Sequence, residues 1–150
     1  MAACAMAAAL PGLLAAQQAG VPQTLPETPL TIATETGTHS FKVMVADDAQ
    51  ERATGLMFRE TMDLDEGMLF IFPREGPRAF WMRNTPLSLD IIFIDDDGHV
   101  VSLAKRTTPF SLESVPSQGD AQFVLELRAG VSDLIRLKPG DRVSHADIAQ

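Results

Sequence analysis

Residues 80–94 read Phe-Trp-Met-Arg-Asn-Thr-Pro-Leu-Ser-Leu-Asp-Ile-Ile-Phe-Ile, and this stretch decides the expected fold. It contains the only tryptophan of the chain and ends in a run of β-branched and aromatic residues. Such runs favour strands, whereas the Asn-Thr-Pro-Leu-Ser segment is typical of a turn. We therefore expect two strands joined at residues 84–88, with Arg83, Asn84 and Asp90 as a polar cluster held against aromatic side chains.

Alternating and apolar runs on both sides of this stretch predict further short strands. They cover residues 30–34, 39–46, 68–72, 99–104, 122–127 and 142–144. The run at 68–72 has no polar face, which predicts a strand buried on both sides. The Asp-Gly pair at 97–98 is typical of a hairpin turn. Proline and glycine predict loops at 73–78 and 105–121.

Two short helices are expected. Asp47 or Asp48 can cap a helix over residues 49–54, and Gly55 would end it. The second helix covers residues 129–137, with an apolar face made of Val131, Leu134 and Ile135. With six to eight short strands and no regular alternation of strand and helix, the chain is predicted to be mainly β, an antiparallel β-barrel or sandwich.

The folded part is expected to be a single domain at residues 30–150, preceded by two other segments. Residues 1–20 carry no charged side chain and end in small residues, which is typical of a signal peptide. They lack the usual basic start, so an alanine-rich helix or tail is the alternative. Residues 21–29 hold three prolines and are read as a linker. This reading predicts a periplasmic or secreted protein.

Charge and composition argue against several kinds of site. The chain has 12 basic and 20 acidic residues and a net charge of −8, which disfavours nucleic acid and anionic membrane surfaces. Cys4 is the only cysteine, so no intramolecular disulfide forms. The three histidines have no metal-binding spacing. We therefore predict no metal and no cofactor.

Several segments together resemble one family, the "domain of unknown function 192" family. They are residues 51–59 (ERATGLMFR), 67–72 (GMLFIF), 80–85 (FWMRNT), 89–94 (LDIIFI) and 124–130 (VLELRAG). The resemblance runs from about Leu30 to Ser144. It implies a compact, mainly β domain that is often exported, and it implies no known reaction. Arg83 stands where a lysine is usual in this motif, which keeps the charge but changes the hydrogen-bond geometry.

Asp90 has two readings. It shares strand parity with Ile92 and Ile94, so its carboxylate begins an otherwise apolar face and must be paired, hydrogen-bonded or protonated. It is either a functional acid or base, or a structural group that accepts backbone N–H bonds at a turn. Glu126 shares a face with Val124, and an Asp90–Glu126 pair would suit a two-carboxylate hydrolase.

Arginine and tryptophan side chains suggest a ligand pocket instead. Arg52, Arg59 and Arg83 together would form a basic pocket for a carboxylate or phosphate, or they would tie loops to acidic partners. Trp81 would wall such a pocket or fill the core.

The leading hypothesis is a non-enzymatic, exported binding or accessory module for a small polar or anionic ligand. Its expected site residues are Arg52, Arg59, Trp81, Arg83, Asn84 and Asp90. The alternative is a small hydrolase that uses Asp90, with or without Glu126. No nucleophile motif supports the alternative, and a purely structural role for the cluster stays open.

Overall fold

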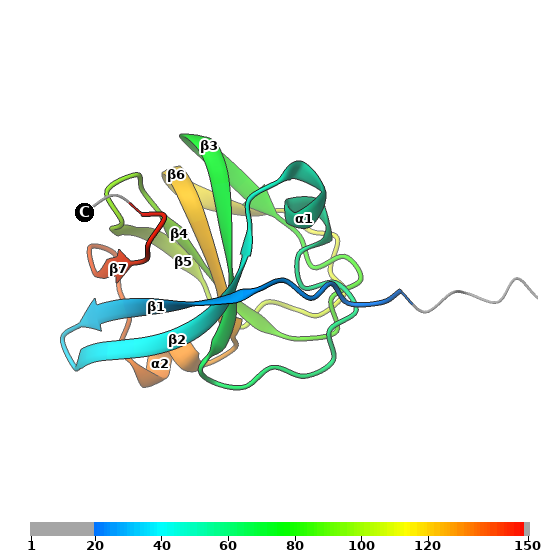
Figure 1. The fold of residues 1–150 in the computed structure, drawn as a ribbon, viewed down its shortest axis with the longest axis horizontal. Coiled ribbons are helices and arrows are strands. Elements are labelled where there is room, and N and C mark those ends of the chain that lie inside the picture. The colour runs from blue at the N-terminus through cyan, green and yellow to red at the C-terminus, as the bar shows by residue number, and fades with distance from the viewer. Residues whose placement is uncertain (1–19, 149–150) are drawn as a thin grey trace, which may run out of the picture.

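Hydrogen-bonded ladders join seven strands into one curled sheet (Figure 1). The computed structural model describes residues 20–148, so residues 1–19 of the expected leader lie outside it. The elements are β1 (Glu27–Thr34), β2 (Gly37–Ala46), α1 (Ala49–Thr54), β3 (Glu66–Phe80), β4 (Leu89–Ile94), β5 (Val100–Ala104), β6 (Val115–Arg128), α2 (Val131–Leu134) and β7 (Arg142–Ser144). β1 begins three residues earlier than predicted, within the expected linker.

The strands lie in the order β5-β4-β6-β3-β2-β1-β7. Every ladder is antiparallel except β2–β3, which is parallel and is connected through α1. The two ends of the sheet approach each other. The Val143 amide donates to the Gly98 carbonyl over 2.8 Å, and the Val100 amide donates to the Asp141 carbonyl over 2.9 Å. The predicted mainly β, mostly antiparallel class with two short helices is confirmed, in the form of a half-barrel.

Buried side chains form two apolar clusters, one on each face of the sheet. On β6, Phe123, Leu125 and Leu127 belong to the first cluster, whereas Val124 belongs to the second. β4 alternates in the same way, because Ile92 and Ile94 join the first cluster and Ile91 and Phe93 join the second. The period of two residues in a strand produces this division.

The predicted loop at 73–78 is wrong, because β3 continues through it. The ladder between β3 and β6 shifts register between Ile71 and Gly76 and again after Pro77. These bulges accommodate the prolines, which cannot donate to a regular ladder. The predicted loop at 105–121 is likewise too long, because β6 begins at Val115.

The first helix matches its prediction closely. Asp48 caps α1 and forms a reciprocal capping box with Glu51, and Gly55 ends the helix with a φ of 49°. The second helix is shorter than predicted, because Arg136 adopts a φ of 54° directly after its last turn. Val131 and Ile135 are buried, but Leu134 is 69% exposed, so Leu134 does not share their face.

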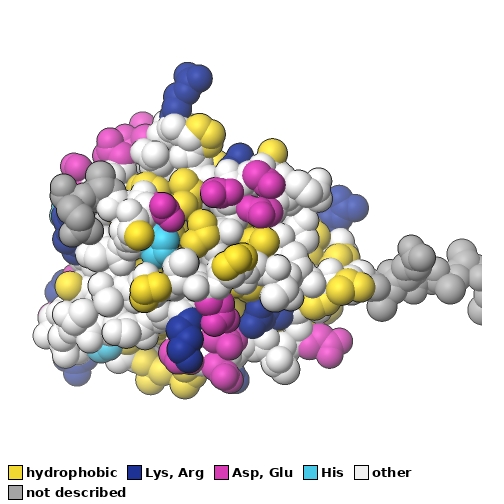
Figure 2. All heavy atoms as spheres, viewed as in Figure 1, with side chains coloured by type: hydrophobic (Ala, Val, Ile, Leu, Met, Phe, Trp, Pro, Cys, Tyr) yellow, Lys and Arg dark blue, Asp and Glu magenta, His cyan; other side chains and the backbone are white. Residues whose placement is uncertain are grey.

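The surface carries charge of both signs. Figure 2 shows Asp and Glu side chains at several places on one face, with Lys and Arg side chains between and beside them. Neither of the two described helices is long and apolar enough to cross a bilayer.

Candidate functional site

A cavity of about 280 Å³ lies between α1 and the long strands β3 and β6. Helix α1 and the turn after it form one wall, and the chain at the end of β3 forms another. Its lining includes Arg52, Phe72, Phe80, Trp81, Arg83 and Glu126. The cavity therefore combines aromatic walls, two guanidinium groups and one carboxyl group.

Glu126 is surrounded by apolar side chains. It is paired with Met68 across the ladder to β3 and with Ile91 across the ladder to β4. Paired residues of antiparallel strands share a face, so the Glu126 carboxyl lies on the side of the second apolar cluster. The residue is 4% exposed, and among the described residues its carboxyl makes no hydrogen bond or ion pair.

Burial raises the pKa of Glu126 to about 8. A carboxyl in an apolar surrounding favours its neutral form, because the charged form loses its hydration. At neutral pH the group is therefore mostly protonated, with an O–H donor available on the cavity wall.

The aromatic walls are held in a fixed arrangement. The Phe80 ring lies edge-to-face against Phe70 at 5.1 Å between centroids, and against Phe72 at 6.4 Å. This geometry is favourable for aromatic pairs and keeps Phe80 in one orientation. Trp81 follows β3 and is 47% exposed, so its indole borders the mouth of the cavity.

Arg52 and Arg83 are the other charged side chains of the lining. Arg52 reaches from α1 toward β3, where its Nη1 donates to the Asp47 carbonyl and to the Ile71 carbonyl, the latter over 2.9 Å. Its guanidinium lies 5.2 Å from the centroid of the Phe72 ring. Arg83 is exposed and lies 5.4 Å from the Trp81 ring. The described residues give Arg83 no ion pair, so its guanidinium is available to a ligand.

The family model for domain of unknown function 192 (DUF192), described as uncharacterized ACR, matches residues 31–145. The chain belongs to the DUF192 family. The resemblance that the sequence motifs indicated is thereby confirmed. A search of curated proteins gave no match.

Solved structures share this DUF192 fold. A Sinorhizobium meliloti 1021 protein, provisionally described as a transcription regulator, is 36% identical with a TM-score of 0.78; the match covers 81% of this chain and 95% of that one. A Novosphingobium aromaticivorans DSM 12444 protein of unknown function is 35% identical with a TM-score of 0.78, over 85% of this chain and 94% of that one.

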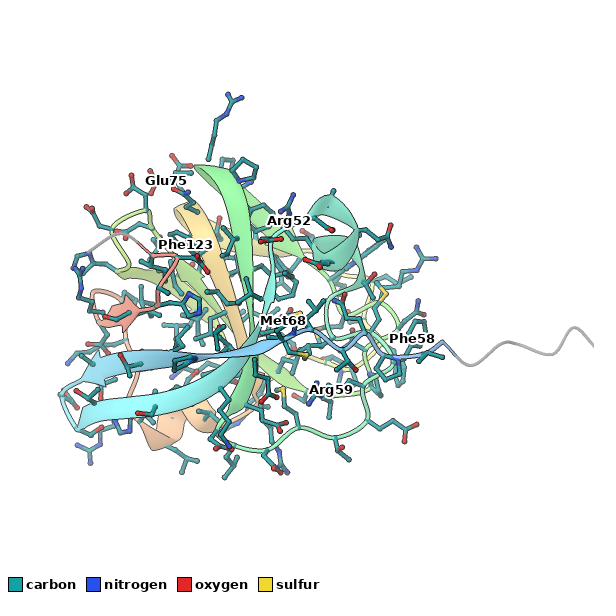
Figure 3. The ribbon with its side chains drawn as sticks, in the orientation of Figure 1. Arg52, Phe58, Arg59, Met68, Glu75 and Phe123 are labelled. Carbon is teal, nitrogen blue, oxygen red and sulfur yellow. The ribbon has the colours of Figure 1, made fainter. Side chains whose placement is uncertain are left out.

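Three of the six expected site residues of this DUF192 chain line the cavity, namely Arg52, Trp81 and Arg83. Arg59 does not join them, because its Nη2 donates to Glu66 over 3.0 Å and its side chain borders another cavity. In Figure 3, Arg52 and Arg59 lie on opposite sides of Met68. The Asn84 amide contacts the sulfur of Met57 at 3.8 Å, while its backbone carbonyl accepts from the Phe58 amide. Asn84 therefore fixes the turn beside the cavity.

Asp90 is fully buried and occupied by backbone groups. Its Oδ1 accepts from the Arg106 amide over 2.9 Å, and its Oδ2 accepts from the Gly130 and Ser132 amides over 3.0 and 2.9 Å. These bonds fasten the loop after β5 and the start of α2 to β4. The geometry agrees with the structural reading, although the amides come from two distant segments and not from the turn after Pro86.

The Asp90–Glu126 pair that the hydrolase alternative would use does not form. Asp90 is paired with Leu127 of the first apolar cluster, whereas Glu126 is paired with Ile91 of the second. Their side chains therefore lie on opposite faces of the sheet. A hydrolase that uses both carboxylates across one substrate is incompatible with this arrangement.

Sequence reasoning missed Phe72 as a wall of the cavity and gave Glu126 only a secondary role. The run at 68–72 was predicted to be buried on both sides, but Phe72 is half-buried and lines the cavity. The signal for Glu126 was present, because a glutamate on the same face as Val124 must stand among apolar neighbours. The missing information was which distant segments cover that face.

A second polar cluster contains Thr28, His145 and Asp147, the residue types of a hydrolase triad, but its histidine donates to the hydroxyl instead of accepting from it. His145 Nδ1 accepts from the Asp147 amide over 3.1 Å, so the neutral ring carries its proton on Nε2. Nε2 then donates to Thr28 Oγ1 over 2.7 Å, and the Thr28 hydroxyl donates to the Val43 carbonyl. His145 cannot take a proton from Thr28 in this arrangement, which instead holds the C-terminal segment on β1.

The described residues contain no group of three or more His, Cys, Asp or Glu side chains that could hold a metal ion.

Proposed function

We propose that this DUF192 protein is an exported, non-enzymatic module that binds one small molecule in the cavity between α1, β3 and β6. The expected ligand site is shifted relative to the sequence hypothesis. Arg52, Trp81 and Arg83 remain in it, Glu126, Phe72 and Phe80 join it, and Arg59, Asn84 and Asp90 are left as supporting residues.

The observation that carries the proposal is the unpartnered Glu126 carboxyl on the cavity wall. A carboxyl group that is 4% exposed loses most of its hydration, and no hydrogen bond from the described residues compensates for that loss. Strongly perturbed carboxyl groups in concave sites are typical of functional residues. Residues that lower stability in this way are expected where function requires them.

The size and walls of the cavity support a small ligand. Its volume of about 280 Å³ falls just below the range of pockets that hold drug-sized molecules. Aromatic side chains with a few polar groups are the usual composition of such a pocket. A metabolite of modest size fits this description better than a peptide.

The alternative, a hydrolase that uses Asp90, has little geometric support. All three amides that meet the Asp90 carboxylate belong to the backbone of this chain, and its side chain is fully buried. Glu126 alone would still need a nucleophile beside it. Thr85, which lines the same cavity, donates its hydroxyl to the Arg83 carbonyl.

We propose no direct contact with nucleic acid. The related Sinorhizobium meliloti protein is provisionally described as a transcription regulator, but this chain has a net charge of −8. The mixed surface of Figure 2 gives no continuous basic patch on that face for a phosphate backbone. A regulatory role would then have to act through a ligand or a protein partner.

Trp81 offers a direct test, because it is the only tryptophan and it borders the cavity. The protein would be screened against carboxylates, phosphates, sugars, amino acids and small aromatic compounds, with thermal unfolding and Trp81 fluorescence as readouts. A ligand of the native state raises the unfolding temperature by mass action. We expect a hit that changes Trp81 fluorescence and is weakened by Arg83→Ala but not by Arg128→Ala, an exposed arginine outside the lining. Hits that bind Arg83→Ala as tightly as the wild type and leave Trp81 fluorescence unchanged would overturn the proposal.

Export is tested separately. Expression of the full chain in a bacterial host, followed by fractionation and intact mass, should give a periplasmic protein that lacks a segment near its start. A full-length cytoplasmic product would contradict export without bearing on the cavity.

A further inference from the structure

We propose that the ligand is a small aromatic anion that turns a hydrogen-bond acceptor toward the Glu126 carboxyl and its negative charge toward the Arg83 guanidinium. This inference rests on the proposed function and adds the chemical class and the orientation of the ligand.

The inner end of the cavity calls for an acceptor. Glu126 is flanked by Met68 and Ile91, which are both fully buried, and no acceptor among the described residues meets its carboxyl. A neutral carboxyl group is a strong donor, and this one lies on the cavity lining, where an acceptor on a ligand can reach it. A ligand carbonyl oxygen or heteroaromatic nitrogen would satisfy it.

A cation is a poorer match for the same position. It would need the ionised form of Glu126, which burial disfavours. It would also share the cavity with Arg52 and Arg83, the other charged side chains of the lining. Burial accounts for the raised pKa of Glu126, and neither guanidinium offsets that effect. The carboxyl and the guanidinium groups therefore act as two separate ends of the site.

The middle of the cavity suits a flat, apolar body. Phe72, Phe80 and Trp81 line it, and the Phe80 ring is fixed by edge-to-face contacts with Phe70 and Phe72. Aromatic side chains stack on or meet the edges of planar ligands. A planar ring would fill this space without ordering many rotatable bonds.

The outer end calls for an anion. The Arg83 guanidinium is exposed beside Trp81 and has no acidic partner among the described residues. The planar fork of arginine binds carboxylates in a bidentate manner. Arg52 uses its Nη1 on two backbone carbonyls, so it adds positive charge to the site while it fixes α1 against β3.

Four ring compounds separate these requirements. Isonicotinate carries a ring acceptor and a carboxylate at opposite ends, benzoate lacks the acceptor, isonicotinamide lacks the anion, and 4-(aminomethyl)benzoate replaces the acceptor with a cation. Each would be titrated into the protein with Trp81 fluorescence as the readout. We expect isonicotinate to bind about tenfold more tightly than benzoate and isonicotinamide. Its affinity should fall between about pH 7 and about pH 9 as Glu126 ionises.

Variants of Glu126 test the assignment. Glu126→Gln keeps a donor without an ionisable group, so it should retain the preference for isonicotinate and lose its pH dependence. Glu126→Leu should bind benzoate and isonicotinate equally. Circular dichroism and thermal unfolding would verify that both variants fold.

The outcomes distinguish this inference from the proposed function. Equal binding of benzoate and isonicotinate by the wild type, still weakened by Arg83→Ala, would overturn the acceptor but keep the binding site. If 4-(aminomethyl)benzoate binds more tightly as pH rises, the ligand group next to Glu126 is a cation and the proposed acceptor is wrong. If no compound binds up to about 10 mM, the aromatic anion is wrong, and the wider screen then decides whether the cavity binds anything.

Discussion

Ile91 and Glu126 face each other across the β4–β6 ladder, on the same side of the sheet. One is a fully buried aliphatic side chain and the other is a buried carboxyl without a partner among the described residues. The pairing explains both the raised pKa of Glu126 and its separation from Asp90, which lies one residue before Ile91 and on the other face. It makes Glu126 the residue on which the functional account depends.

Replacing Glu126 should change how stability depends on pH. Its pKa is about 8 in the folded protein against an ordinary value of 4.5, so the folded state holds a proton that the unfolded state releases. The contribution of this group to the free energy of unfolding is complete below pH 4.5 and is lost as pH rises to about 8. Each pH unit in this window lowers the free energy of unfolding by about 1.4 kcal/mol, so the total loss is about 5 kcal/mol. Between these pH values the free energy of unfolding of Glu126→Gln, measured with urea, should increase relative to that of the wild type.

The exposed Glu113→Gln serves as the matched control and should follow the wild type. A constant difference between Glu126→Gln and the wild type at all pH values would contradict the prediction.

Asp90→Asn should destabilise the protein strongly. The amide keeps the shape of the carboxylate but removes its charge, and one of its two ends donates where backbone amides also donate. Hydrogen bonds to charged groups contribute about 1.5–3 kcal/mol each, so we expect a loss of about 3 kcal/mol in unfolding free energy. Asp96→Asn, on the exposed turn after β4, should lose almost nothing. Equal stability of the two variants would reopen a functional role for Asp90.

Asp48→Ala should lower stability by about 1 kcal/mol, because it removes the side-chain cap of α1. Asp47→Ala is the comparison, since no hydrogen bond of the described residues uses the Asp47 side chain. Chemical denaturation of both variants measures the difference. Asp48→Ala should also weaken ligand binding, because Arg52 on α1 lines the cavity.

His145 should make the protein less stable in mild acid. Burial lowers the pKa of His145 below its usual 6.5, so the unfolded state takes up a proton more readily. The stability contributed by the neutral ring is present above pH 6.5 and is lost as pH falls from 6.5 through the lower pKa of the folded state. His145→Gln should therefore lose less stability than the wild type on acidification. The same loss in both proteins would assign the effect to other groups.

Local sequence signals predicted much of this fold. The Asp-Gly turn, the Asp48 cap and the alternation along β4 and β6 depend on neighbours a few residues apart, and each appears in the structure. The prolines of β3 misled the prediction, because bulges allow them within a strand when the partner strand shifts register. Leu134 was misplaced because Arg136 ends α2 after a single turn.

The candidate site was only partly predictable. Arg52, Trp81 and Arg83 were recognised as unusual, and they do line one cavity. Asp90 drew attention because its parity marks a carboxylate on an apolar face, but Glu126 has the same property on the opposite face. The two carboxyl groups differ in their hydrogen-bond donors. Backbone amides of Arg106, Gly130 and Ser132 donate to Asp90, whereas no amide of the described residues donates to the Glu126 side chain. Tertiary contacts of this kind are not encoded in local periodicity.

The most direct measurement is a carbon NMR titration of the Glu126 side-chain carboxyl in the unliganded protein, assigned with Glu126→Gln. The account predicts a pKa of about 8, well above the ordinary value of 4.5, and a further change when a ligand with a ring acceptor is added. A pKa near 4.5 would mean that the carboxyl is hydrated or paired, and the case for a ligand site around Glu126 would lose its foundation.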